Sequence, residues 1–298
     1  MRHAVISDIH ANQEALQAVL AELATIARRV GEPFESLWCL GDLVGYGPEP
    51  AECVDLVRAH TDVVIPGNHD RAVAGMLSVE QFNDSAQVTA DWTRNRLSSE
   101  HLRYLAEITE RRVFNECTLV HGSPRNPVWE YLTSSEGAQA SFPCFSTKFC
   151  LVGHTHVPSI FLQKESPDEL TTAARSAPKR GRLIKEARLV DDLADQDMLM
   201  NNLAARQEAV VQQTLAATCE MLLPGEGVWV PPTGYRAIIN PGSVGQPRDN
   251  DPRAAFMVYD TNRGFEFYRV EYPIEQTQRK IWRSGLPARM AVRLTYGI

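Results

Sequence analysis

The sequence predicts an α/β fold, and three observations support that prediction. Short apolar segments rich in β-branched residues alternate with longer amphipathic segments through the first half of the 298-residue chain. Near-continuous apolar runs of this kind are typical of strands that are covered on both faces. A side chain able to bind a metal follows most of these runs, at the edge where open α/β sheets bind ligands.

The first half is expected to contain strands separated by amphipathic helices. The first helix is predicted over 12–30, with Asn12 as its cap, Leu16 and Val19 on its apolar face and Gly31 as its C-terminal cap. Strands are predicted at 3–7, 37–40, 62–65, 117–120 and 149–152, and further helices at 50–59, 84–97 and 99–108.

The second half interrupts this pattern and then resumes it. A strand at 159–163 is followed by a polar, basic stretch at 164–188 and by a predicted helix at 189–222. We interpret 164–232 as a charged and helical insertion in a single domain that spans residues 1–298. Strands are then expected at 235–239, 254–259 and 265–271, with a closing helix at 274–284.

Composition limits the classes of function. A hydrophobic content of 44% is ordinary for a globular protein, and a net charge of −7 argues against a dedicated nucleic-acid binder. A metal centre could still attract a small anion, because it supplies positive charge locally. The chain opens on a strand and has no apolar run long enough to cross a bilayer, so we expect a cytoplasmic protein without a membrane partner.

Five motif segments place oxygen and nitrogen ligands after predicted strands. This donor set suits divalent ions such as Mn, Fe, Zn or Mg better than a thiolate site does. Taken singly, each residue could instead be a turn former, a helix cap or a surface histidine. Five of the eight histidines fall in these segments, however, and together they favour a metal centre. The segments are 7–10, 41–42, 67–70, 120–122 and 153–156.

The order of these motifs resembles that of the calcineurin-like metallophosphoesterase family. The resemblance covers residues 1–160, and the 240–248 loop is similar to a later loop of the family's small bacterial members. It implies a four-layer αββα sandwich, in which two mixed β-sheets are flanked by helices. The motifs are Asp8-x-His10, Gly41-Asp42-x-x-Gly45, Gly67-Asn68-His69-Asp70, His121 and Gly153-His154-x-His156.

The resemblance also implies hydrolysis of phosphate esters by two divalent metal ions, with Mn favoured over Fe, Zn or Ni. Asp42 would be shared by both ions, His69 would act as the catalytic proton donor, and Asp70 would orient His69. The implied ligands are Asp8, His10, Asp42 and His156 for the first ion, and Asp42, Asn68, His121 and His154 for the second.

Three arginines lie beside the motif loops. Arg71, Arg125 and Arg248 are candidates to pair bidentately with a substrate phosphate, and a solvated position is the alternative for each.

The substrate stays open on the sequence alone. Phosphodiesters, phosphomonoesters, phosphorylated Ser/Thr proteins and dinucleoside polyphosphates are all substrates of the family. The acidic net charge disfavours a nuclease. A non-catalytic scaffold, as in the small subunit of retromer, is disfavoured because His69 and every ligand position are present. The expected partner is a small or phosphorylated substrate, and the amphipathic 189–222 segment leaves a homo-oligomer open.

Overall fold

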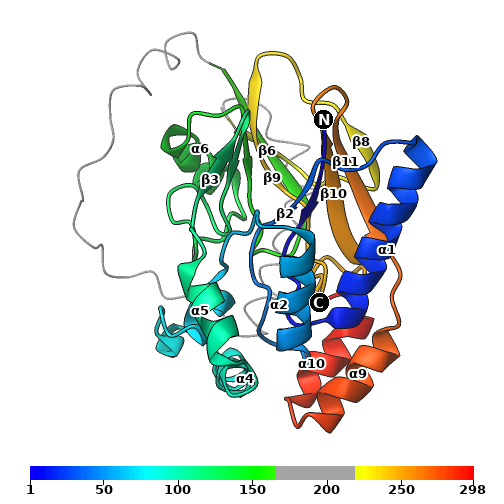
Figure 1. The fold of residues 1–298 in the computed structure, drawn as a ribbon. Helices are drawn as coiled ribbons and strands as arrows, with labels where there is room; N and C mark the ends of the chain where they lie inside the picture. The colour runs from blue at the N-terminus through cyan, green and yellow to red at the C-terminus, as the bar shows by residue number, and fades with distance from the viewer. Residues whose placement is uncertain (166–218) are drawn as a thin grey trace.

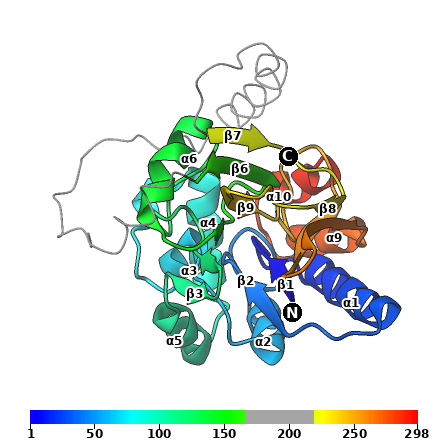
Figure 2. The same ribbon diagram turned by 90° about the horizontal axis from the view of Figure 1, so that it is seen from above.

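The computed structural model describes residues 1–165 and 219–298. Two mixed β-sheets pack face to face, with helices on their outer sides (Figures 1 and 2). Helix α1 packs on β10 of the first sheet, and α6 packs on β6 and β7 of the second. The predicted αββα arrangement is therefore confirmed.

The first sheet joins the two ends of the chain. Its strands lie in the order β2-β1-β10-β11-β8 in the described residues. Strand β1 pairs in parallel with β2 and antiparallel with β10, so the first motif loop lies beside the 240–253 loop that precedes β10. The strands are β1 (Arg2–Ile6), β2 (Ser36–Cys39), β8 (Gly227–Trp229), β10 (Ala254–Asp260) and β11 (Gly264–Val270).

The second sheet has three parallel strands at its centre. Its order in the same part of the chain is β3-β4-β5-β9-β6-β7, in which β4, β5 and β9 are parallel. The strands are β3 (Arg112–Phe114), β4 (Cys117–Leu119), β5 (Phe149–Leu151), β6 (Ser159–Lys164), β7 (Cys219–Leu222) and β9 (Tyr235–Asn240).

Helix ends follow the capping chemistry of the sequence. The Asn12 side chain accepts a hydrogen bond from the Ala15 N–H at the start of α1, and Gly31 ends the helix with a φ of 76°. None of the described helices combines the length and apolarity that a bilayer span needs. The helices are α1 (Gln13–Val30), α2 (Pro50–His60), α3 (Asn68–Val73), α4 (Asp84–Arg94), α5 (Ser99–Glu107), α6 (Ser135–Ser141), α9 (Ile274–Arg283) and α10 (Ala288–Val292), with 3-10 turns η1 (Val79–Gln81), η2 (Phe142–Cys144) and η3 (Arg293–Thr295).

Successive side chains of a strand point to opposite faces of its sheet, so one strand contacts both neighbouring layers. On β1, the side chain of Val5 packs in the cluster between the two sheets, whereas Ala4 and Ile6 pack with Leu16 of α1. Because β1 is buried on both faces, it has the continuous apolar sequence that predicted it.

The structure corrects two element predictions. Residues 62–65 are not a strand; they make one isolated bridge, between Cys39 and Val64, and Pro66 follows, which has no N–H to extend the ladder. Residues 219–222, predicted as the end of a helix, form β7 instead, because they pair with β6. The rest of that predicted helix lies outside the described residues.

The described part of the predicted insertion adds one edge strand to each sheet. Strand β7 pairs with β6, and β8 pairs with β11. Neither strand was predicted from the sequence, and β3, α3, α6 and α10 were also missed. The division of the chain into one domain with an insertion at 164–232 stays a prediction.

Substitution of Leu16 tests whether the inner face of α1 is packed in the core. Its side chain is fully buried, so Leu16→Ala should lower the free energy of unfolding by about 2–5 kcal/mol through lost transfer energy and a residual cavity. Val88→Ala, on the exposed side of α4, should change it by less than about 0.5 kcal/mol. Denaturant unfolding measures both, and equal losses would contradict the packing of α1.

Candidate metal centre

Left-handed backbone turns direct the motif side chains inward. Residues with positive φ include Asp8 (54°) and His10 (48°) after β1, Asp42 (52°) after β2, and His154 (69°) and His156 (61°) after β5. A non-glycine residue in this region costs roughly 1–2 kcal/mol, so the surrounding structure must hold it there. Strain of this kind clusters at functional sites.

Backbone hydrogen bonds hold the motif loops together. The N–H of Asp8 donates to the carbonyl of Gly41 (3.0 Å), and the N–H of His10 donates to that of Asp42 (2.9 Å). The Asp8 carbonyl in turn accepts a bond from the Gly245 N–H (2.9 Å). The loops after β1 and β2 and the loop before β10 are thereby fixed relative to one another.

Each of the four motif histidines outside α3 uses one ring nitrogen to contact a backbone carbonyl. A carbonyl only accepts hydrogen bonds, so that nitrogen carries a proton, and in a neutral ring the other nitrogen presents a lone pair. The contacts are His10 Nδ1 to Val44 (3.1 Å), His121 Nδ1 to Leu40 (2.7 Å), His154 Nε2 to Trp129 (3.1 Å) and His156 Nδ1 to Gln246 (2.6 Å).

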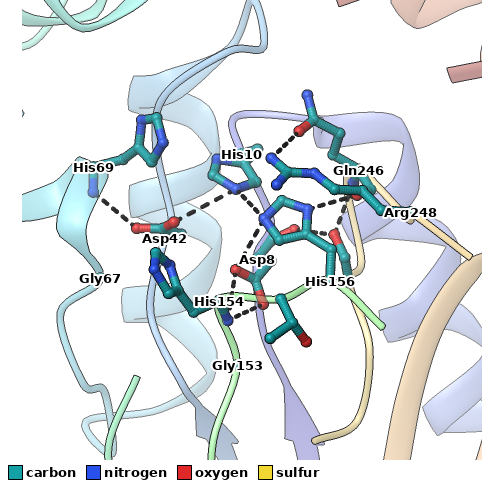
Figure 3. Close-up of polar contacts among 12 residues, drawn as sticks. Asp8, His10, Asp42, Gly67, His69, Gly153, His154, His156, Gln246 and Arg248 are labelled. Atoms are coloured by element: carbon teal, nitrogen blue, oxygen red, sulfur yellow. Dashed lines mark hydrogen bonds and ion pairs between the residues drawn. The ribbon is translucent and has the colours of Figure 1, made fainter. Parts of the chain in front are cut away.

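A first group of ligand atoms forms around His10 and His156 (Figure 3). Their Nε2 atoms lie 3.1 Å apart. His156 Nε2 is 3.3 Å from Asp8 Oδ1, and His10 Nε2 is 3.5 Å from Asp42 Oδ2. These four side chains each offer one atom within 4.8 Å of the others.

A second group forms on the other side of Asp42. His121 Nε2 lies 3.2 Å from His154 Nδ1 and 3.4 Å from Asp42 Oδ2. The Oδ1 atom of Asn68 is buried and has no hydrogen-bond partner in the described part of the chain. Asp42 Oδ2 thus lies close to the nitrogens of both groups.

The chemistry of these atoms fits a divalent metal. Burial lowers the pKa values of His10, His154 and His156 well below the ordinary value, so these imidazoles are neutral. Two lone-pair nitrogens about 3 Å apart repel each other unless a cation lies between them, and nitrogens that share one zinc ion at about 2.0–2.1 Å stand at a similar separation.

The buried carboxylates of the site also favour a cation, because a buried negative charge is costly without a positive charge beside it. Burial raises the pKa of Asp8 to about 6. For Asp42, burial alone would raise the pKa, but the charges of His121, His69 and His10 together outweigh burial and hold the pKa below the ordinary value. Burial alone would lower the pKa of His121, yet Asp42 and Asp8, with the hydrogen bond to the Leu40 carbonyl, raise it to about 9. A divalent ion can replace that imidazolium charge beside Asp42.

His69 lies next to both groups without joining either. It is on α3, and its backbone N–H donates to Asp42 Oδ1 (3.0 Å). The ring centroid is 4.4 Å from that of Tyr46 and 5.0 Å from that of His10. Burial lowers its pKa to about 4. Among the residues that the structure describes, its buried Nδ1 has no hydrogen-bond partner.

Asp70 has different partners from those expected. Its Oδ1 accepts a bond from the Val44 N–H (3.2 Å), and its Oδ2 accepts one from the Gly67 N–H (2.9 Å). Within residues 1–165 and 219–298 no hydrogen bond joins Asp70 to the His69 ring, and both carboxylate oxygens accept from backbone N–H groups instead. Asp70 instead ties the loop after β2 to the start of α3. At Gly67 a Cβ would lie 1.8 Å from Asp42 Oδ1, so only glycine permits this approach.

Two of the three candidate arginines are held by other parts of the protein. Arg71 donates to the carbonyls of Ala106 and Ile108 at 2.7 Å each, which anchors α3 to the end of α5. Arg125 pairs with Glu130 in the loop after β4. A role for either in substrate binding stays a prediction.

Arg248 is the candidate arginine that lies beside the predicted metal ligands. Figure 3 shows its guanidinium next to His10 and His156. It donates to Gln246 Oε1 (2.8 Å), and its side chain is buried. The sequence had marked the 240–248 loop but gave no role to its residue Gln246, whose carbonyl contacts Nδ1 of His156. Nor did it mark Trp129, whose carbonyl fixes His154.

Comparison with known proteins agrees with this geometry. The family model for calcineurin-like phosphoesterases matches residues 1–158, more than half of the chain. A metallophosphoesterase from Sphaerobacter thermophilus is 35% identical, with a TM-score of 0.72 and 100% of each chain covered. Hypothetical protein PH1004 from Pyrococcus horikoshii OT3 shares the fold, with 19% identity, a TM-score of 0.67, and 100% and 98% covered. Uncharacterized protein MJ0912 from Methanocaldococcus jannaschii is 29% identical over 306 residues, covering 99% of this chain and 97% of its own.

Metal binding should stabilise the fold. At a free metal concentration of 100 times the dissociation constant, one site adds about 2.7 kcal/mol to the free energy of unfolding. Adding Mn²⁺ to metal-free protein should therefore raise Tm, and His10→Ala should reduce this rise while His60→Ala, on an exposed side chain of α2, should not. Thermal scans with and without metal measure the shift. An equal rise in all three proteins would place the bound metal elsewhere.

Proposed function

Because the chain belongs to the calcineurin-like phosphoesterase family, we propose that it hydrolyses phosphate esters with two divalent metal ions. The observation that supports two ions is the position of Asp42 Oδ2, which lies 3.5 Å from His10 Nε2 and 3.4 Å from His121 Nε2. A carboxylate shared in this way is what a two-metal hydrolase needs. The proposed ligands are Asp8, His10, Asp42 and His156 for one ion, and Asp42, Asn68, His121 and His154 for the other.

Bound metals would supply an activated hydroxide and positive charge for the phosphoryl oxygens. The protein's part is to fix the geometry. Backbone carbonyls orient the imidazoles, as second-layer partners of metal ligands commonly do, and the strained turns keep Asp8 and Asp42 aimed at one place. The oxygen and nitrogen donors favour Mn, with Fe, Zn and Ni as alternatives.

His69 is proposed to donate a proton, or a hydrogen bond, to the leaving oxygen. Its imidazole is held beside Asp42, and the site leaves its Nδ1 without a hydrogen bond among the described residues. A hydrogen-bonding group in a dry site acts strongly on charge that develops in the transition state. Asp70 acts on this step through the loops that it joins, since it does not contact the ring.

Turnover should depend on the ligand set. The metal-loaded protein should hydrolyse p-nitrophenyl phosphate or its bis-ester, and His121→Ala should lower kcat by more than about 100-fold, the upper range for loss of an outer partner. His60→Ala should retain wild-type kcat. A wild-type protein that carries its metals yet cleaves none of a monoester, a diester or a dinucleoside polyphosphate would support the scaffold alternative instead.

Substitution of His69 should reduce catalysis without reducing metal binding. His69→Ala is expected to lower kcat by roughly 10²–10⁴-fold, the usual contribution of a positioned acid or base, while metal content per chain stays at the wild-type level. Steady-state kinetics and elemental analysis on the same sample measure both quantities. Loss of metal together with activity would instead make His69 a ligand.

A further inference from the structure

The buried side chain of Asn12 joins two loops that are far apart in the sequence. Asn12 lies two residues after His10, and its Oδ1 accepts from the Ala15 N–H (3.2 Å) as the cap of α1. Its Nδ2 donates to the carbonyl of Gly245 (2.9 Å), in the loop before β10. An amide oxygen only accepts and an amide nitrogen only donates, so these two partners fix which way the amide faces. Asn12 is therefore a link between loops as well as a helix cap.

The loop at the other end of this link orients His156. Gly245 precedes Gln246, whose carbonyl accepts from His156 Nδ1 (2.6 Å). The N–H of Gly245 donates to the carbonyl of Asp8 (2.9 Å), and a Cβ at Gly245 would lie 1.7 Å from the carbonyl oxygen of Ile9. The loop that orients one imidazole of the first group thus lies directly against the loop that carries the other.

Packing alone does not confine His10. A small cavity lies beside it, and the residues that line this cavity include Asn12, Tyr46, Thr277 and Leu294. Close-packed neighbours confine a buried side chain, and a cavity removes such contacts on one side. The position of the His10 ring therefore depends more strongly on the hydrogen bonds that fix its loop.

Helix α9 holds Asn12 from the C-terminal part of the chain. The helix packs against α1 (Figure 1) and lies outside residues 1–158 matched by the family model. Thr277 of α9 is fully buried, and its hydroxyl lies 3.1 Å from Asn12 Oδ1 and 3.0 Å from Glu14 Oε2, two acceptors that share its one proton. Lys280, also on α9, pairs with Glu14 as well. Two side chains of α9 thus contact the first turn of α1 and its cap.

We propose that Asn12 is a positioning residue for the first metal ion, which sets the separation of His10 and His156 and is itself held by Thr277. The Nε2 atoms of the two histidines lie 3.1 Å apart. A shift of one loop against the other changes this separation, and an ion bound at about 2.0–2.1 Å from each nitrogen tolerates little change. The affinity for this ion therefore depends on a hydrogen bond that touches no ligand atom.

Other parts of the chain position the second group. His121 contacts the carbonyl of Leu40, and His154 contacts that of Trp129, so neither imidazole is oriented by α9 or by the loop before β10. Loss of the Asn12 link should therefore weaken the first ion and spare the second. The inference rests on the proposed two-ion function, but metal affinity tests it without turnover.

Metal affinity in two single-site backgrounds tests the link. His154→Ala keeps the first group of ligands, and His156→Ala keeps the second. Asn12→Ser is the test variant, because serine still caps the helix while its one hydroxyl cannot also reach Gly245. Titration of metal-free full-length protein with Mn²⁺ in a calorimeter should show binding that is roughly 10–100-fold weaker in the His154→Ala background, the usual cost of losing an outer partner of a metal ligand. In the His156→Ala background, Asn12→Ser should leave the affinity unchanged.

Two sets of controls separate positioning from a general loss of structure. Asn83 caps α4 by accepting from the Ala86 N–H (2.8 Å), so Asn83→Ser makes the same change at another cap and should leave the affinity unchanged in both backgrounds. Thr277→Val removes the hydroxyl and should weaken the first ion, whereas Thr277→Ser keeps the hydroxyl and should bind like the parent protein. The Thr277 pair gives the test on its own if Asn12→Ser does not fold.

Equal losses of affinity in the two backgrounds, or no loss in either, would overturn the proposal. Equal losses in Thr277→Val and Thr277→Ser would overturn the role of α9. The result is distinct from that for the proposed function. Selective weakening of the first ion in a protein that cleaves no ester would support the link and reject the hydrolase. Turnover by a two-ion wild type, with both affinities unchanged by Asn12→Ser, would support the hydrolase and reject the link.

Discussion

The strained backbone after β1, β2 and β5 is the constraint on which the centre depends. Asp8, Asp42 and His154 each have a positive φ, and each turns its side chain toward the same place between the strand ends. The strain of roughly 1–2 kcal/mol per residue is offset because both sheets and the 240–253 loop hold these turns through backbone hydrogen bonds. A relaxed backbone would carry the same side chains away from one another.

With the turns after β1, β2 and β5 fixed, the polar groups that they bury determine which ligand the centre can bind. The neutral imidazoles of His10, His154 and His156 donate their protons to carbonyls and present lone pairs. Asp42 presents one oxygen to both groups. The second half of the chain completes this arrangement. Gln246 fixes His156 and Arg248, while Leu294 of η3 lines the small cavity beside His10. Residues after 158 therefore contribute contacts to the centre itself.

The sequence predicted the elements whose signal is local. Asn12 and Gly31 bound α1 as expected, and the strands that precede Asp8 and Asp42 were recognised from continuous apolar runs. The order of the motifs also brought all seven proposed ligands into consideration. By contrast, 62–65 resembles a strand in composition but has only one bridging partner, a property of the tertiary structure.

The features that the sequence missed depend on distant parts of the chain. The bonds of Asp70 go to backbone N–H groups, and those of the histidines go to carbonyls as far away as 90 residues. A backbone group has the same chemistry at every position, so no residue type marks it. Leu294 stood in an unassigned tail for the same reason, since only its packing in one cluster with Tyr46 reveals its place.

The central claim, that Asp42 is shared by two metal ions, is tested most directly by metal stoichiometry. Elemental analysis after equilibrium dialysis should find two divalent ions per chain in the wild type. His156→Ala and His154→Ala should each lose one, whereas Asp42→Ala should lose tight binding of both. Retention of one fully occupied ion in Asp42→Ala, or a single ion in the wild type, would contradict the shared ligand.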